Sequence, residues 1–188
     1  MHPVRKHIRL RNYDYSSKGY YFITICTDER KCFFGYIENG IMILNDIGKN
    51  VNEYLLEIPN HFKHALLDEF TIMPNHIHLI LGLNYNIPSV RTRHGVSQQD
   101  GISQQDGISQ QEQSTNKFGK LNKNSVSVII NQFKSSVKRW CNKNGHENFK
   151  WQPRFHDHII RNEGEHKRIK QYIIDNPSNW KEDKLSDK

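Results

Sequence analysis

ALLDEFTIM (Ala65–Met73), Pro74-Asn75 and HIHLILGL (His76–Leu83) form the stretch that says most about the fold. Two apolar runs rich in aliphatic residues flank a turn-forming pair, so we predict two neighbouring strands. Successive side chains of a strand point to opposite faces of the sheet. His76 and His78 should therefore project together from one face, while the apolar residues between and after them enter the core.

The residues upstream predict another strand and a hairpin. Tyr20–Cys26 (YYFITIC) is aromatic and β-branched, which is typical of a buried strand. The short apolar runs Phe33–Ile37 and Ile41–Leu44 flank Glu38-Asn39-Gly40. Asn-Gly tolerates the positive φ angles of a tight turn, so these runs predict a β-hairpin.

A helix is predicted between the hairpin and the stretch quoted first. Apolar residues recur at helical spacing from Ile47 to Ile58. Asn45 or Asp46 is suited to the N-cap, and Pro59 is expected to end the helix.

The composition changes after Leu83. Residues 84–124 are rich in Gln, Ser, Asp and Gly, and GVSQQD at Gly95 repeats as GISQQD and GISQQE. A solenoid needs apolar residues to stack, and each of these hexapeptides has only one. We therefore expect a flexible insert at about 84–124 that carries no chemistry.

Three further elements are predicted after the insert. One apolar helical stripe runs from Ser125 to about Gly145, Phe155–Ile160 is a strand, and Glu163–Asn176 is a last helix that Pro177 ends. The tail after that helix is expected to be frayed. This order predicts an α+β protein: a single domain over residues 1–188 with a ferredoxin-like antiparallel sheet and helices packed on one face.

The charge of +7 favours a polyanionic partner. Two groups of cations are candidate DNA contacts. The first is Arg5, Lys6, Arg9 and Arg11 near the N-terminus, and the second is Lys134, Lys138 and Arg139 in the long helix.

The cysteines and the hydropathy predict a cytoplasmic location. Three cysteines without a CxxC pair fit reduced thiols rather than a zinc site. No apolar run is as long as a membrane span, and no signal peptide is recognisable, so no membrane partner is expected.

His76 and His78 are the first candidates for chemistry. Two neutral imidazoles on one strand face can chelate a divalent cation, although two ordinary surface histidines have the same pattern. His156-Asp157-His158 repeats the pattern on a second predicted strand. There a phosphate contact or plain strand polarity is the favoured alternative to a metal site.

Tyr172 and Asn176 are the second candidates, because residues four apart lie on one face of a helix. The Asn176 side-chain oxygen could complete a metal site that the two histidines begin. The alternative is that Tyr172 packs against the sheet and Asn176-Pro177 only ends the helix.

Taken together, these segments resemble the REP-associated tyrosine transposases, within the wider class of His-hydrophobic-His (HUH) single-tyrosine transposases. The resemblance extends over nearly the whole chain apart from the insert. The motifs that carry it are Tyr13-Asp14-Tyr15, YFITICT (Tyr21–Thr27), Leu44-Asn45 with Gly48, Asp68-Glu69, MPNHIHLIL (Met73–Leu81), Phe133-Lys134-Ser135, FHDHIIR (Phe155–Arg161), Tyr172-Ile173, Asn176-Pro177 and Trp180.

The resemblance implies that His76 and His78 bind a metal, that Tyr172 is the nucleophile and that Asn176 is a third ligand. The implied substrate is single-stranded DNA with hairpin structure, and the implied product is a 5′-phosphotyrosine. An imidazole and amide site suits Mn²⁺ or Mg²⁺. Arg168, one turn before the tyrosine, is a candidate clamp on the scissile strand. Members of the class act as monomers or homodimers, so both states stay open.

Three other functions are considered. The first is a non-catalytic regulatory protein that binds hairpin DNA and descends from a transposase. The second is a replication-initiation or plasmid-nicking enzyme with the same chemistry. The third is a ferredoxin-like RNA-binding module, which would not need the histidine pair.

Overall fold

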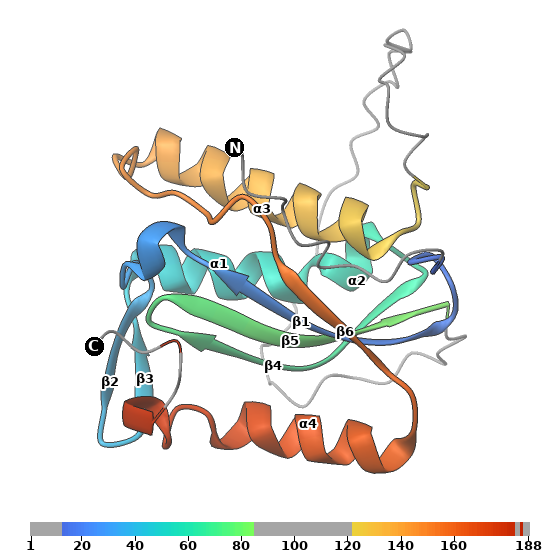
Figure 1. Cartoon of the computed structure of the whole chain (residues 1–188). Coiled ribbons are helices and arrows are strands. Elements are labelled where there is room, and N and C mark those ends of the chain that lie inside the picture. Colours follow the sequence, from blue (N-terminus) through green and yellow to red (C-terminus); the bar gives the residue numbers. More distant parts are fainter. Residues whose placement is uncertain (1–12, 85–121, 183–184, 186–188) are drawn as a thin grey trace, which may run out of the picture.

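The computed structural model describes residues 13–84, 122–182 and 185. Its centre is a four-stranded sheet in the order β4-β5-β1-β6, and every neighbouring pair is antiparallel. The strands are β1 (Gly19–Cys26), β4 (Ala65–Met73), β5 (His76–Leu83) and β6 (His156–Ile160). Figure 1 shows the sheet between a layer of helices on one side and a single helix on the other.

The chain passes through the sheet as two β-α-β units. Helix α1 (Asp46–Leu56) joins β1 to β4, and α3 (Val126–Lys143) joins β5 to β6. In each unit one strand of the other unit lies between the two joined strands. This is the ferredoxin-like arrangement, so the predicted class and topology are confirmed.

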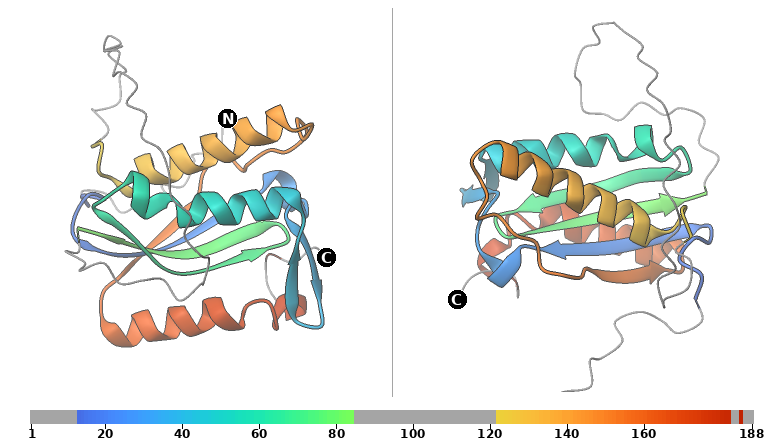
Figure 2. Two further views of the ribbon diagram at one scale, coloured as in Figure 1. Left: turned by 180° about the vertical axis from the view of Figure 1, so that it is seen from behind. Right: turned by 90° about the horizontal axis from the view of Figure 1, so that it is seen from above.

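The larger core lies between the sheet and the layer formed by α1, α2 and α3 (Figure 2). Alternate strand residues such as Ile23, Ile77 and Leu79 are fully buried there and pack with Val51 and Ile130 of the helices. Burial of each such side chain stabilises the fold by roughly 1.5–3 kcal/mol. This face therefore fixes which strand residues point away from it.

One detail differs from the sequence prediction. Helix α4 (Glu163–Asp175) packs against the opposite face of the sheet, not beside the other helices. Its buried Ile169 and Ile173 contact Ile80 and Ile160. Strand β5 is buried on both faces, and its sequence does not tell which helix covers which face.

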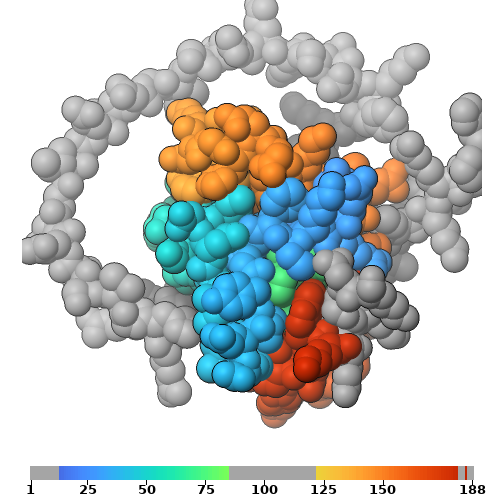
Figure 3. Space-filling view, turned by 90° about the vertical axis from the view of Figure 1, so that its left-hand side faces the viewer, coloured from blue at the N-terminus to red at the C-terminus, as the bar shows by residue number. Residues whose placement is uncertain are grey.

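The shorter elements mostly match the prediction. Strands β2 (Gly35–Glu38) and β3 (Ile41–Leu44) form the expected hairpin, with Asn39 and Gly40 at φ 50° and 76°. Two short helices are additional: η1 (Asp28–Arg30) and η2 (Trp180–Glu182). The hairpin lies against the end of α4, since a Cβ built on Gly40 would be 3.4 Å from Ser178 (Figure 3).

The predicted boundary at Pro59 needs correction. Pro59 does not end the predicted helix. It lies instead in the first turn of a second, short helix, α2 (Ile58–His61). Proline is well accommodated in a first turn because the amide it lacks has no partner there.

Three expectations fall largely or wholly outside the described residues: the basic N-terminal arm, the insert at 84–124 and most of the tail. Of the helices that are described, none has the length and apolar character needed to cross a membrane.

Gly48 generates the first prediction, because it is helical yet has no room for a methyl group. A Cβ at this position would lie 2.2 Å from the Phe34 carbonyl oxygen. The backbone amide of Gly48 also donates a hydrogen bond to the Asn45 side chain. Alanine usually stabilises an exposed helical glycine site by about 1 kcal/mol. We expect Gly48→Ala instead to lower the free energy of unfolding by about 1–3 kcal/mol, measured by urea denaturation.

The matched control is Gly164→Ala in the first turn of α4. A Cβ there meets only the Asn162 side-chain oxygen, at 3.4 Å, so this change should leave stability unchanged or raise it slightly. Equal effects of the two alanines would contradict the packing described for α1.

Candidate active site

The two histidines occupy the α4 side of β5. In the sheet, His76 pairs with Cys26 and His78 with Thr24. Both imidazoles are buried, with exposed fractions of 0% and 3%. The pattern of alternating faces is therefore as the sequence predicts, but the pair lies beneath α4 and not at an open surface.

A hydrogen-bond network fixes the tautomer of His76. The Asn75 amide nitrogen donates to the carbonyl oxygens of Arg30 (3.0 Å) and Leu185 (2.7 Å), which identifies the other amide atom as Oδ1. That oxygen lies 2.8 Å from His76 Nδ1 and can only accept. Nδ1 of His76 therefore carries the proton, and its Nε2 carries the lone pair.

The second imidazole faces the first across a short distance. Nδ1 of His78 lies 2.8 Å from Thr24 Oγ1, and its Nε2 lies 3.1 Å from His76 Nε2. A proton on His78 Nδ1 would leave two lone pairs directed at each other, an arrangement that a shared cation resolves. In metal sites, a hydrogen bond at the ring nitrogen that does not bind the metal orients the histidine ligand.

Burial keeps His76 neutral. Desolvation, with a smaller contribution from the positive charge of Arg30, lowers the pKa of His76 to about 3. At neutral pH this imidazole is thus a ligand that needs no deprotonation before binding a cation.

Tyr172 reaches the pair from α4. Its hydroxyl lies 3.3 Å from His78 Nε2, and its ring stands edge-on to Phe22 at 6.1 Å. The residue is 46% exposed, so one side of the phenol contacts the histidine and another side contacts solvent. A substrate could therefore reach this oxygen from outside while the two imidazoles stay covered.

Asn176 lies one turn beyond Tyr172, where it forms the C-cap of α4. It is only 3% exposed, although asparagine is normally a surface residue. Among the described residues no third His, Cys, Asp or Glu joins the pair to form a metal cluster. A divalent cation at the two Nε2 atoms would need oxygen ligands, for which the Asn176 amide has the right chemistry.

Sequence reasoning gave no role to the residues that surround the pair. Thr24 and Asn75 orient the imidazoles, the Phe22 ring stacks on His78 at 5.2 Å, and the Trp180 ring lies 6.0 Å from that of His76. Because Asn75 is adjacent to His76 in sequence, its contact with the imidazole could have been predicted. The contact of Thr24 could not, because it depends on the register between β1 and β5.

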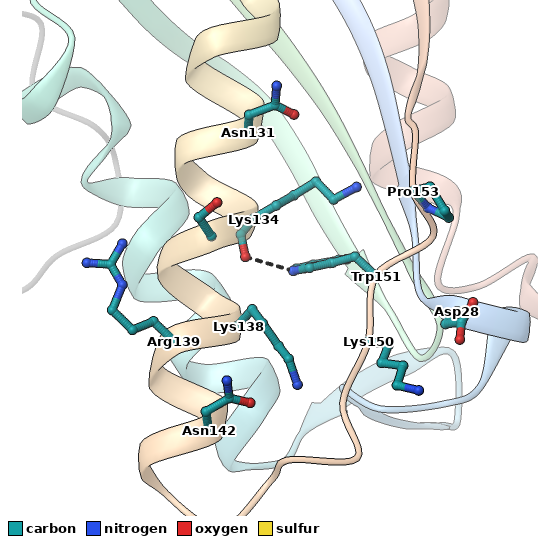
Figure 4. A pocket seen from close by; sticks show the side chains of 10 residues that line it. Asp28, Asn131, Lys134, Lys138, Arg139, Asn142, Lys150, Trp151 and Pro153 are labelled. Atoms are coloured by element: carbon teal, nitrogen blue, oxygen red, sulfur yellow. Dashed lines mark hydrogen bonds between the residues drawn. The ribbon is translucent and has the colours of Figure 1, made fainter. Parts of the chain in front are cut away.

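The predicted basic residues of α3 lie on the other side of the sheet, beside a hollow of about 760 Å³ (Figure 4). Two of them bind the segment that leads into β6. Lys134 Nζ donates to Gln152 O at 2.6 Å, and Lys138 Nζ donates to Phe149 O at 2.7 Å. Both ammonium groups therefore have a structural role.

The same hollow contains residues that the sequence did not single out. Lys150 and Trp151 line it opposite Arg139, and the Trp151 indole donates to Lys134 O at 3.0 Å. Burial lowers the pKa of Lys134 to about 8. The exposed Arg139 and Lys150 are the members of this surface best placed to meet an outside anion.

The remaining predicted contacts are separate from this surface. Arg168 lies one turn before Tyr172, with its side chain 75% exposed and one guanidinium nitrogen 3.8 Å from the Glu165 carboxylate. Arg5, Lys6, Arg9 and Arg11 lie outside the described residues.

The lowered pKa of His76 gives a prediction about stability. In the unfolded chain the His76 imidazole takes up a proton near pH 6.5, whereas in the folded chain it does so only near pH 3. Its contribution to stability is therefore fully present above pH 6.5 and is lost as the pH falls toward 3. The free energy of unfolding is measured by urea denaturation at pH 6.5 and at pH 5, with EDTA present. Between these two pH values we expect it to fall by about 2 kcal/mol less in His76→Gln than in the parent protein. Parallel losses in the two proteins would show that His76 is protonated in the folded state.

No family model matches the chain. An uncharacterized protein of Haemophilus influenzae is 37% identical over 181 residues, which are 96% of this chain and 92% of that protein. The solved structure of a REP-associated tyrosine transposase bound to a REP hairpin aligns with a TM-score of 0.56 at 17% identity, over 91% of this chain and 73% of the other. The chain therefore belongs to one family with the Haemophilus influenzae protein and has the fold of the REP-associated tyrosine transposase.

Proposed function

We propose that the protein is a transposase-like, metal-dependent endonuclease and strand transferase that acts on single-stranded DNA at hairpins. The observation that carries this proposal is the position of the Tyr172 hydroxyl, 3.3 Å from the Nε2 atom of a histidine pair whose Nε2 atoms are 3.1 Å apart. A half-exposed phenol beside two buried imidazoles, of which His76 is kept neutral by burial, is an arrangement that a packing role for Tyr172 does not require.

Tyr172 would be the nucleophile. Its oxygen attacks the scissile phosphorus, and the bond from phosphorus to the 3′-oxygen breaks. The phenol loses its proton as the new oxygen–phosphorus bond forms, and the leaving 3′-oxygen takes up a proton. The products are a 5′-phosphotyrosine and a 3′-hydroxyl. Because the phosphodiester energy is retained in the tyrosine ester, the 3′-hydroxyl of another strand can reverse the step and join new ends.

His76 and His78 would hold the cation through their Nε2 atoms, with the Asn176 amide as an oxygen ligand. When bound, Mg²⁺ or Mn²⁺ supplies Lewis-acid stabilisation of charge on the phosphate. The hydrogen bond that His76 Nδ1 donates to Asn75 Oδ1, and the hydrogen bond between His78 Nδ1 and Thr24 Oγ1, would keep both imidazoles in place. Phe22 and Trp180 would limit the access of water to the pair.

The substrate is inferred from two features. The solved structure with the same fold holds a REP hairpin. In this chain, Arg139 and Lys150 at the hollow beside α3 supply positive charge for phosphate contacts, and the exposed Arg168 supplies it near Tyr172. We expect binding that weakens as salt rises, because each neutralised phosphate releases counterions.

Covalent trapping tests the proposal. We expect the protein to form an adduct with a labelled single-stranded hairpin oligonucleotide, taken from DNA flanking its gene, when Mn²⁺ or Mg²⁺ is present. Denaturing gels would detect the adduct. Tyr172→Phe should abolish it, and His76→Ala or EDTA should reduce the rate at least about 100-fold, as for loss of a main transition-state stabiliser.

Controls separate chemistry from folding. Tyr172→Phe should keep the parent's thermal stability and its hairpin affinity, because the ring that packs beside Phe22 is retained. Hairpin binding without an adduct under either metal would refute the enzymatic proposal and favour a regulatory hairpin-binding protein.

The basic surface generates a separate prediction. We expect Arg139→Ala to weaken hairpin binding and to reduce the slope of log K against log salt by about one. Lys49→Ala is the matched control, since this exposed lysine of α1 already pairs with Asp46 at 3.4 Å. Fluorescence anisotropy at several salt concentrations measures both slopes, and equal slopes would remove Arg139 from the DNA contacts.

A further inference from the structure

FHDHIIR (Phe155–Arg161) contains two histidines to which the proposed function gives no role. Its two histidines lie on β6, the edge strand next to β1. In the sheet register His156 pairs with Thr24 and His158 with Phe22. Directly paired residues share a face, so both imidazoles lie on the side of the sheet that carries Tyr172 and the histidine pair.

His156 is in line with the metal-ligand pair. Thr24 is paired with His78 on one side and with His156 on the other, so the three residues form one row across the sheet. Two strand spacings separate the outer members, which places their Cα atoms about 10 Å apart. Each imidazole extends several ångströms from its Cα atom, so phosphates that lie close together on one DNA strand can meet both ends of this row.

The two histidines of β6 differ in their contacts. His158 Nε2 lies 2.8 Å from the Glu165 carboxylate, which also accepts from the Arg161 amide at 2.9 Å. An anion at His158 would therefore meet a carboxylate. His156 is exposed, and in the part of the chain that is described no hydrogen bond or ion pair occupies its ring.

A stripe of helix α4, formed by Glu165, Arg168 and Tyr172, faces this strand. Glu165 binds His158 on β6, and Arg168 and Tyr172 follow it at positions i+3 and i+7, which lie on the same helix face. His166 and Lys170 lie on the other flank, where they bind Asp68 of β4. The nucleophile therefore faces the β6 side of the helix, toward the row that ends in His156.

We propose that His156 is a positioning residue for the DNA strand: its imidazole donates a hydrogen bond to a phosphate next to the scissile one. This inference rests on the proposed function. The bound strand passes between the α4 stripe and β6, with Arg168 on one side and His156 on the other. The Glu165–His158 pair excludes phosphate from the end of that path near the start of α4.

A protein–DNA coupling experiment tests the contact. Binding is measured in the Tyr172→Phe background, so that no cleavage occurs, on hairpin oligonucleotides carrying one uncharged methylphosphonate at each position around the cut. We expect one position to weaken binding about tenfold, the value of a hydrogen bond to a charged group. Adding His156→Ala should weaken binding of unmodified DNA by a similar factor and abolish the effect of that one methylphosphonate.

Variants show whether the effect is specific. His156→Gln, which keeps a donor, should restore part of the affinity and of the methylphosphonate effect. His61→Ala, a change at an exposed histidine of α2 in the other helix layer, should alter neither. If His156→Ala binds like its parent, or leaves every methylphosphonate effect in place, the inference is overturned.

The outcome is separable from that of the proposed function. Adduct formation with Tyr172 intact, together with unchanged methylphosphonate effects in His156→Ala, would overturn only the role of His156. Absence of any adduct would refute the nuclease, while a coupled loss at one phosphate would still establish that His156 contacts the strand.

Discussion

The pairing of β5 with β1 is the constraint on which the site depends. Its register sets Thr24 beside His78 and leaves Ile77 and Leu79 in the larger core. A slip of one residue would turn both imidazoles into that core and move Ile77 and Leu79 to the face that α4 covers. The aliphatic residues each contribute roughly 1.5–3 kcal/mol, so the core holds the register. The histidines, whose burial costs free energy, are placed by it.

Tyr172, the proposed nucleophile, is positioned by a much smaller set of contacts. Helix α4 buries Ile169 and Ile173 against one patch of the sheet and adds ion pairs from His166 and Lys170 to Asp68. These ion pairs are partly exposed and stabilise little by themselves. Their value is geometric, because they fix the rotation of α4 about its axis and so direct Tyr172 toward β5 and β6.

Local pattern was sufficient for the four strands of the sheet and for the three long helices. The strand Ala65–Met73 and the strand His76–Leu83 were predicted with their observed bounds, since a turn pair separates two apolar runs. The nearness of Tyr172 to His78 was implied by family resemblance, and 94 residues separate them in sequence. Spacing on one helix or strand cannot supply a contact of that kind.

What local pattern missed depends on three-dimensional register. Thr24 contacts a histidine only because of strand pairing, and Lys150 joins the basic surface only because the segment before β6 folds against α3. The helix-spaced lysines Lys134 and Lys138 were predicted as phosphate contacts. Their ammonium groups bind main-chain carbonyls, which no periodicity argument could reveal.

The two surfaces inferred for DNA lie on opposite faces of one sheet, and this limits how a single molecule can be bound by both. The hollow beside α3 is on the face of the larger core, whereas Tyr172 is on the face of α4 (Figure 1). A strand that contacts both must cross an edge of the sheet. At the β4 edge, the ion pairs of Asp68 with α4 and the helix layer on the other face block the path of such a strand.

At the β6 edge the chain itself makes the connection. Trp151 and Pro153 line the hollow, the Trp151 backbone pairs with Thr27 beyond the end of β1, and His156 begins β6 a few residues later. The segment between α3 and β6 thus leads from the basic surface to the row that contains His78. A hairpin stem at α3 and a cleaved strand at Tyr172 are compatible in one complex if the DNA passes over this edge, and the imidazole that it meets there is His156.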